Sequence, residues 1–262
     1  MTFIALPFAI GAIGFGLAGF LHGDFWLQWQ LVPESLPARA PLALFSNALL
    51  VAGGAMLLWR PLALWGALLL AGSYGLWAIV VHAARLAAHP LNAGVWLAFT
   101  EVVTFAVGGA VLALLLTGGA RPVAMRAARI VFAGCAFVFG LCHFVYLDIT
   151  AGMVPAWMPG RHFLAALTGA AHIAAAASLA SGVLSRLAAA LFTAMVASFA
   201  LLVHIPRVIG DPASHMEWAM LFIAVSLAGA AWILRTGIAA HAGPGEGSKL
   251  SWIRARRSAP AR

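Results

Sequence analysis

Apolar residues in this chain form long continuous runs, and none of the runs alternates with the period of two that strands show. The runs cover residues 3–22, 42–59, 62–82, 94–116, 127–147, 163–182, 186–205 and 216–235. Each is close to the roughly 20 apolar residues that a helix needs to cross a bilayer. Proline or arginine marks most of the breaks between them. The pattern predicts an all-α membrane protein with eight transmembrane helices.

The composition agrees with this prediction. Hydrophobic residues make up 64% of the chain, charged residues 8%, and the mean hydropathy is +1.00. This leaves too little polar surface for a water-soluble globule, so the lipid bilayer is the expected surrounding. The 15 Lys and Arg residues lie mostly singly between apolar runs. Because they form no basic stripe on a polar surface, no nucleic-acid partner is expected.

Basic residues are unevenly divided between the two sides of the predicted bundle. One side contains Arg60, Arg121, Arg126, Arg129, Arg186, Arg235, Lys249, Arg254, Arg256, Arg257 and Arg262. The other contains only Arg39, Arg85, Arg161 and Arg207. By the positive-inside rule, this predicts a multi-pass protein of a bacterial-type inner (plasma) membrane with both termini in the cytoplasm. Residues 241–262 are predicted to be a basic, disordered cytoplasmic tail.

Two stretches 122 residues apart share their rare residues. VVHAARLAAHPLNAGVW at 80–96 and LVHIPRVIGDPASHMEW at 202–218 place His, Arg, Pro and Trp at the same spacing. The offset continues through the Val-Pro pairs at 32–33 and 154–155, and it becomes 121 at the pair His22 and His143. We therefore predict two four-helix repeats, residues 1–120 and 121–240. They should be parallel, because four spans return the chain to the same side.

The Pro-bearing loop after the first helix of each copy, VPESLP and VPAWMP, resembles that of the DoxX-like family of small membrane proteins. The likeness extends through most of the second copy and reaches the first mainly through the repeat. It implies a membrane component of redox metabolism, such as a subunit of a thiosulfate:quinone oxidoreductase or of an assembly that detoxifies radicals. The glutamate usual on the family's second helix is replaced by His172 in the second copy and by Leu50 in the first.

Most polar side chains of the apolar segments lie toward the predicted outer side, at helix ends. The candidate cofactor-binding residues there are His22, His82, Arg85, His143, His204 and Arg207. Imidazoles from neighbouring helices could ligate a transition metal or haem iron, or could donate a hydrogen bond to a quinone carbonyl. The alternative is that His, Arg and Trp cap helix ends in the headgroup layer. The tryptophans expected there are Trp26, Trp29, Trp96, Trp157 and Trp218.

Glu101 and His172 are the candidate catalytic residues. Each lies deep in an apolar run, and each has an apolar partner, Ile223 or Leu50, at the equivalent repeat position. Their comparable depth predicts that they meet where the copies pack, with Asn47 nearby. A buried acid beside a histidine would suit proton-coupled chemistry. The alternative is that each hydrogen-bonds a neighbouring helix and only stabilises the bundle.

The leading functional prediction is the membrane subunit of a quinone-linked redox system. Quinone is the expected cofactor, haem or a metal stays open, and a soluble or membrane redox protein is the expected partner. This prediction rests on the family resemblance. The alternatives are a transporter of a small solute or metal, and a non-catalytic scaffold for soluble redox enzymes. Whether the chain is itself an enzyme stays open.

Overall fold

The structure is a computed structural model that describes residues 2–26, 29–118 and 121–241. Within these ranges the chain forms helices and no strand, and eight segments are long and apolar enough to cross a membrane. These segments are Phe3–His22, Arg39–Leu58, Arg60–Ala88, Ala93–Leu116, Pro122–Val145, Arg161–Ser181, Ser185–Gly210 and His215–His241. The predicted all-α membrane protein with eight spans is confirmed. The predicted tail, apart from His241, lies outside the described residues.

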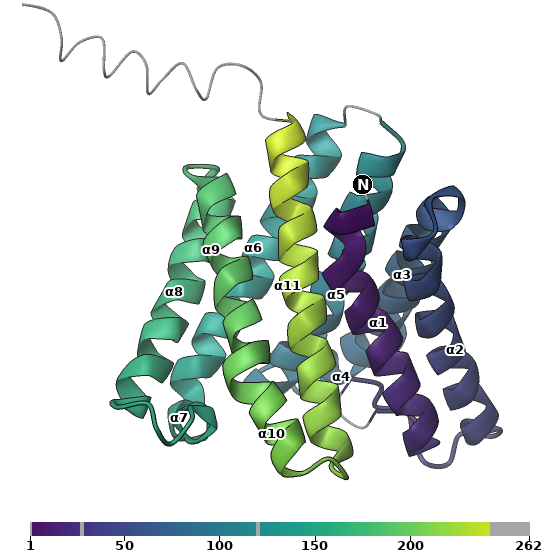
Figure 1. Ribbon diagram of the computed structural model, residues 1–262, viewed down its shortest axis with the longest axis horizontal. Helices are drawn as coiled ribbons and strands as arrows, with labels where there is room; N and C mark the ends of the chain where they lie inside the picture. The colour runs from purple at the N-terminus through teal and green to yellow at the C-terminus, as the bar shows by residue number, and fades with distance from the viewer. Residues whose placement is uncertain (1, 27–28, 119–120, 242–262) are drawn as a thin grey trace, which may run out of the picture.

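The helices run up and down between two faces (Figure 1). The elements are α1 (Thr2–His22), α2 (Arg39–Leu58), the 3₁₀ turn η1 (Arg60–Leu62), α3 (Ala63–Trp77), the π-helical turn η2 (Ala78–Ala83), α4 (Ala84–Ala88), α5 (Ala93–Leu116), α6 (Pro122–Val145), α7 (Leu147–Met153), α8 (Arg161–Ser181), α9 (Ser185–Phe199), the π-helical turn η3 (Ala200–His204), α10 (Ile205–Gly210) and α11 (His215–His241). The start of α1 and the end of α11 lie at the same face. We call the opposite face, where α1 ends and α11 begins, the loop face. The charge pattern predicts that it is the outer face.

The third and seventh spans extend beyond their predicted ends, to Ala88 and Gly210. In each, a π-helical turn, η2 or η3, precedes the last turns of helix. A proline such as Pro206 bends or ends a helix when it lies in the helix interior. Pro206 lies instead in the first turn of α10, where a missing backbone N–H costs little. His82 lies on η2 and His204 on η3, and such turns are frequent at functional sites.

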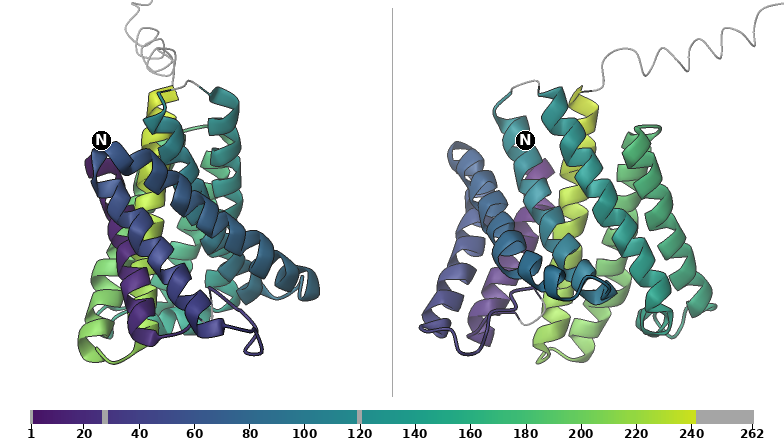
Figure 2. Two further views of the ribbon diagram at one scale, coloured as in Figure 1. Left: turned by 90° about the vertical axis from the view of Figure 1, so that its right-hand side faces the viewer. Right: turned by 180° about the vertical axis from the view of Figure 1, so that it is seen from behind.

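The centre of the bundle is α11, which contacts α1, α5, α6 and α9. Small residues allow this close packing. A Cβ atom at Gly229 would lie 2.4 Å from the backbone nitrogen of Phe8, and one at Gly108 would lie 2.7 Å from the Cβ of Ala230. The third span is less enclosed, and Figure 2 shows it running obliquely away from the other helices toward the loop face.

Gly229→Ala is expected to destabilise the fold by about 1–3 kcal/mol, because its methyl group overlaps the α1 backbone and forces the helices apart. The measurement is the thermal unfolding midpoint of the purified chain in detergent. Gly134→Ala on α6 is the matched control, since nothing lies within 4 Å of the added Cβ. Equal midpoints for the two variants would contradict the packing described for α1 and α11.

The outer surface of the bundle is apolar. Ile79, Phe163 and Leu201 are 73%, 68% and 62% exposed although they lie on transmembrane segments. Large apolar side chains facing outward on several spans are expected where lipid rather than water surrounds the protein. The chain is therefore an integral membrane protein of the helical type.

The two halves of the chain share several structural features. In each half the first helix packs on the second, the second on the third and the third on the fourth, and the halves meet where the first helix of one contacts the last helix of the other. The indoles of Trp96 and Trp218 donate to the carbonyls of Pro90 and Pro212 at 2.8 and 3.0 Å. These correspondences are those that a duplication would produce; the repeat itself stays a prediction.

Candidate functional site

The segment after α1 turns back into the bundle at the loop face. Gly23 begins the turn with a φ of +74°, which glycine adopts readily. The side chains of Trp26 and Trp29, 4% and 3% exposed, pack on Phe15 with ring centroids 5.0 and 5.8 Å away. The expectation that these tryptophans are anchors in the headgroup layer is wrong, because they face the protein interior.

Arg39, at the start of α2, holds the two ends of this segment together. Its Nε lies 2.8 Å from the Asp24 carboxylate, and its guanidinium donates to the carbonyls of Val32 and Pro33 at 2.5 and 3.0 Å. Burial raises the pKa of the Asp24 carboxyl. Hydrogen bonds from the Phe25 backbone N–H and from Arg39, with attraction to the guanidinium, outweigh burial and hold that pKa below its usual range.

The Asp24–Arg39 pair is expected to stabilise the folded chain only above acidic pH. Because the folded-state pKa of Asp24 lies below the ordinary value of 3.8, its contribution is present above pH 3.8 and is lost as the pH falls further, through the folded-state pKa. The Asp24 side chain is 41% exposed, so the effect is small. Thermal unfolding midpoints of the wild type and Asp24→Asn should differ at pH 6 and converge at acidic pH; a gap that persists in acid would contradict this account.

Trp29 connects this segment to the middle of the bundle. Its indole Nε1 donates to a carboxylate oxygen of Glu101 at 2.5 Å. Glu101 lies on α5 and is 8% exposed. Among the described residues it forms no salt bridge within 4.0 Å, so a neutral N–H is its hydrogen-bond partner. Glu101 is thus a buried acid held by one neutral donor within a transmembrane segment.

His82 binds the backbone of the same tryptophan. Its Nε2 lies 2.7 Å from the Trp29 carbonyl oxygen, and the side chain is fully buried. A carbonyl only accepts, so Nε2 carries the hydrogen and Nδ1 of the neutral ring is an acceptor. This Nδ1 has no hydrogen-bond partner within the described part of the chain. Trp29 is therefore held from η2 and from α5, and an acceptor nitrogen beside it is unused.

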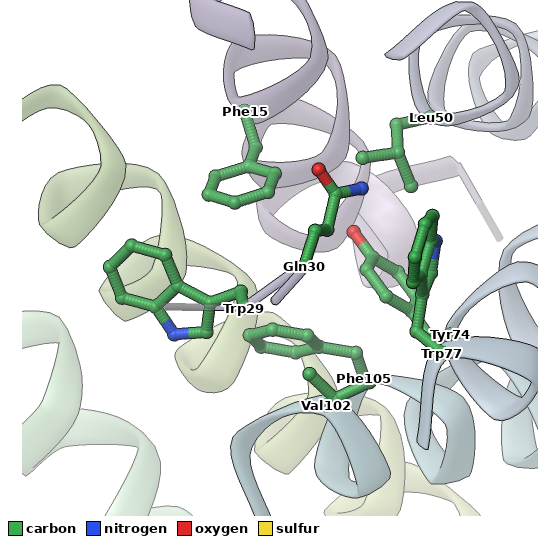
Figure 3. Close-up of a pocket in the computed structure, with 8 residues that line it drawn as sticks. All are labelled: Phe15, Trp29, Gln30, Leu50, Tyr74, Trp77, Val102 and Phe105. Atoms are coloured by element: carbon green, nitrogen blue, oxygen red, sulfur yellow. The ribbon is translucent and has the colours of Figure 1, made fainter. Parts of the chain in front are cut away.

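A small cavity lies beside Trp29, on the side of α2 and α3 (Figure 3). Its volume of about 10 Å³ has room for roughly one water molecule. Gln30 is on its wall; the side-chain amide donates to Ser46 at 2.8 Å and accepts from the Trp26 backbone N–H at 3.2 Å. The cavity is lined by Phe15, Trp29, Gln30, Leu50, Tyr74, Trp77, Val102 and Phe105.

In the second half, His143 of α6 and His172 of α8 lie together, with ring centroids 4.7 Å apart. Each Nδ1 is 2.8 Å from a backbone carbonyl of its own helix, at Phe139 or Thr168. The ring of His172 also packs at 5.2 Å from that of Phe192. This environment is that of histidines packed in an aromatic core, one nitrogen of each being satisfied by its own helix.

The expected meeting of Glu101 and His172 is wrong. Glu101 bonds Trp29, whereas His172 lies among rings of α6 and α9, and α6 packs between their two helices. Asn47, which was expected nearby, packs against α1. It is fully buried on α2 against α1, where a Cβ at Gly19 would lie 2.3 Å from its side-chain oxygen. Comparable depth in the membrane did not imply proximity because the two residues face different neighbours around the bundle.

The two predicted His and Arg pairs differ in their contacts. Arg85 is exposed on α4. Arg207 on α10 instead binds Glu217 of α11 through two hydrogen bonds of 2.8 and 2.5 Å. His204 is 6% exposed, and its Nδ1 lacks a partner among the described residues, as that of His82 does. The repeated motif therefore places its histidines alike and its arginines differently.

The remaining candidate, His22, ends α1 at the loop face and lies against His215, with 2.6 Å between the two Nδ1 atoms. The candidate cofactor-binding residues thus do not form one cluster: His82, His143 and His204 lie on separate helices, where His82 bonds the Trp29 carbonyl and His143 bonds the carbonyl of Phe139 on its own helix. Within residues 2–26, 29–118 and 121–241, no group of three or more His, Cys, Asp or Glu side chains is placed to hold a metal ion.

Comparison with protein-family models, with curated proteins and with solved structures finds no match for this chain. The resemblance to the DoxX-like family therefore stays a prediction. The arrangement around Trp29 was not predicted from the sequence, because Trp29 and Gln30 lie in what reads as a connecting loop. The available signal was the run GDFWLQWQ, which is unusually rich in aromatic and amide side chains for a loop.

Proposed function

We propose that this protein is the membrane subunit of a quinone-linked redox system, in which Glu101 exchanges the protons of the quinone reaction near the loop face. The observation that carries the proposal is the Glu101 carboxylate itself. It is 8% exposed within a transmembrane segment, and a neutral indole N–H is its partner. Ionisable residues that face the interior of a membrane bundle commonly mark proton, ion or substrate pathways.

The residues around Glu101 suit this chemistry. Oxidation of a quinol to a quinone releases two protons and two electrons. A carboxylate can accept the protons one at a time and pass each onward. The electrons would go to a redox partner protein. The rings of Trp77 and Phe105, which line the cavity beside Trp29, offer flat apolar surface for a headgroup.

Access to Glu101 requires movement of Trp29 in this proposal. The cavity has room for roughly one water molecule, which is far less than a quinone headgroup needs. The indole of Trp29 is a flat ring already bonded to Glu101. A quinol that enters would replace this ring, and its hydroxyl would donate to Glu101 in place of the indole N–H.

The test is whether quinone chemistry changes the protonation of Glu101. The purified full chain is extracted to identify bound quinone, and infrared difference spectra are recorded while added quinone is reduced and reoxidised. The wild type should show a carboxyl C=O band that Glu101→Gln lacks. The matched control is Glu34→Gln, which removes an exposed acid and should keep the band. If the wild type binds no quinone, or if the band persists in Glu101→Gln, the proposal is wrong.

A second candidate function is proton-coupled transport of a small solute. The observation favouring it is that Trp29 is held from two helices, by Glu101 and by His82. Transfer of a proton at Glu101 would alter one of these two bonds and so could release Trp29. Solute flux into proteoliposomes that depends on a pH gradient and disappears in Glu101→Gln, without bound quinone, would favour transport over the redox proposal.

A further inference from the structure

Two histidines from opposite ends of the sequence meet at the loop face. His22 is the last residue of α1 and His215 is the first residue of α11. Their Nδ1 atoms are 2.6 Å apart and their ring planes cross at 81°. Because α1 and α11 pack together along the bundle, the helices rather than a flexible loop set the distance between the rings.

The position of each ring is further restricted by its neighbours. His22 stacks on the buried Trp26, with ring centroids 5.3 Å apart and planes inclined by 15°. Its Nδ1 faces that of His215 on α11. His215 is exposed and His22 is half-buried, so an ion can reach the pair from water. The two Nδ1 atoms form a preorganised pair of nitrogen donors that joins the first and last spans.

The distance between the two nitrogens is close to that of a metal chelate. Zinc lies about 2.0–2.1 Å from imidazole nitrogen, so ligand angles of 90° to 110° require the nitrogens to be roughly 2.9–3.4 Å apart. Separating the two atoms by under about 1 Å, through small ring rotations, meets this requirement. In the absence of an ion, one ring can donate an N–H to the other. The ion would replace that shared proton.

The neighbouring carboxylates are engaged elsewhere. Asp24 binds Arg39 and the Phe25 N–H, and Glu217 binds Arg207. This agrees with the finding that the described residues contain no cluster of three or more ligands. The pair would therefore supply two nitrogen ligands, and water would complete the coordination. Imidazole suits Zn²⁺, Ni²⁺ and Cu²⁺, and Cu²⁺ binds most strongly in this series.

We propose that His22 and His215 form a binding site for a divalent transition-metal ion of the Cu²⁺, Ni²⁺ and Zn²⁺ group. The site lies at the loop face, on a different set of side chains from those around Glu101, and it does not depend on the proposed redox function. An ion bound there would connect the first and last spans. Since the pair is assembled only in the folded chain, binding would stabilise the fold.

The test uses the full chain, purified without a polyhistidine tag, and Cu²⁺ alone as the probe. The wild type should bind one Cu²⁺, and pulsed electron paramagnetic resonance should show two coordinated imidazoles. The His215→Gln and His22→Gln variants should each lose the two-imidazole signal and this binding site. His89→Gln is the control, since His89 is exposed and lies outside the pair. This variant should retain the two-imidazole signal and the Cu²⁺ binding site.

A stability measurement separates loss of the site from loss of the fold. Cu²⁺ should raise the thermal unfolding midpoint of the wild type and of His89→Gln, and it should leave that of His215→Gln unchanged. His215 is exposed at the first position of α11, so His215→Gln should fold without Cu²⁺ as the wild type does. A wild-type signal from a single imidazole, or wild-type Cu²⁺ affinity in both pair variants, would overturn the proposal.

Discussion

Glu101→Gln is expected to fold as the wild type does and to lower quinol-dependent electron transfer by about 10²- to 10⁴-fold, the range contributed by a positioned acid or base. The amide oxygen of glutamine can accept the indole hydrogen bond that Trp29 donates at 2.5 Å, so the local packing is retained. The amide cannot exchange a proton, so the proposed step is lost. The rate is measured in membranes that contain the whole system and is normalised to the amount of the chain.

Two further variants distinguish loss of the acid at Glu101 from loss of the hydrogen bond that Trp29 donates to it. Glu101→Leu removes the acceptor as well as the acid and leaves the Trp29 N–H unpaired, which should cost about 1–3 kcal/mol of stability beyond Glu101→Gln. Glu34→Gln removes an exposed acid and should leave the rate unchanged. If Glu101→Gln retains the wild-type rate, the side chain only stabilises the bundle, as the alternative reading of the sequence holds.

Trp29→Ala is expected to lower the free energy of unfolding by about 3–5 kcal/mol, the usual cost of truncating a large buried aromatic side chain. Trp29 is 3% exposed and lies edge-on to Phe15, and its indole is the hydrogen-bond donor to Glu101. The variant removes these contacts and leaves a buried acid without its partner. Denaturant titration in mixed micelles measures the change.

The matched control for this variant is Trp157→Ala, because Trp157 is 72% exposed and should contribute little. Trp29→Phe separates packing from the hydrogen bond, since it retains a ring and loses the N–H donor. Combined with Glu101→Leu, it should be less destabilising than the two single changes added together. Additive effects in this cycle would contradict a direct bond between Trp29 and Glu101.

Much of the fold could be predicted from local sequence alone. Runs of about 20 apolar residues identify spans because a helix satisfies its own backbone hydrogen bonds in lipid. The spans starting at Phe3 and Ala93 were predicted within a residue or two of their observed ends. The third span was predicted six residues short, since a π-helical turn and an exposed Arg85 lie beyond its most apolar part.

The candidate site was predicted less well. Glu101 was identified as a buried acid because a charged residue deep in an apolar run is rare. Its partner was missed, since Trp29 belongs to a connecting segment whose path depends on packing against Phe15 and on the Arg39 contacts. His172 was paired with Glu101 on depth alone, and depth along the membrane normal says nothing about direction around a helix.

The sequence by itself determined that this chain is helical, crosses a membrane eight times and has an acid within its fourth span. These features depend on local composition, because an apolar run enters the bilayer and a helix satisfies the hydrogen bonds of its own backbone there. Only the tertiary structure decided that Trp29 bonds both Glu101 and His82, and that His22 meets His215 across 193 residues of chain. Lateral packing of helices in lipid depends on the fit of small and large residues between neighbours. That fit is a property of pairs of helices, and no single apolar run contains it.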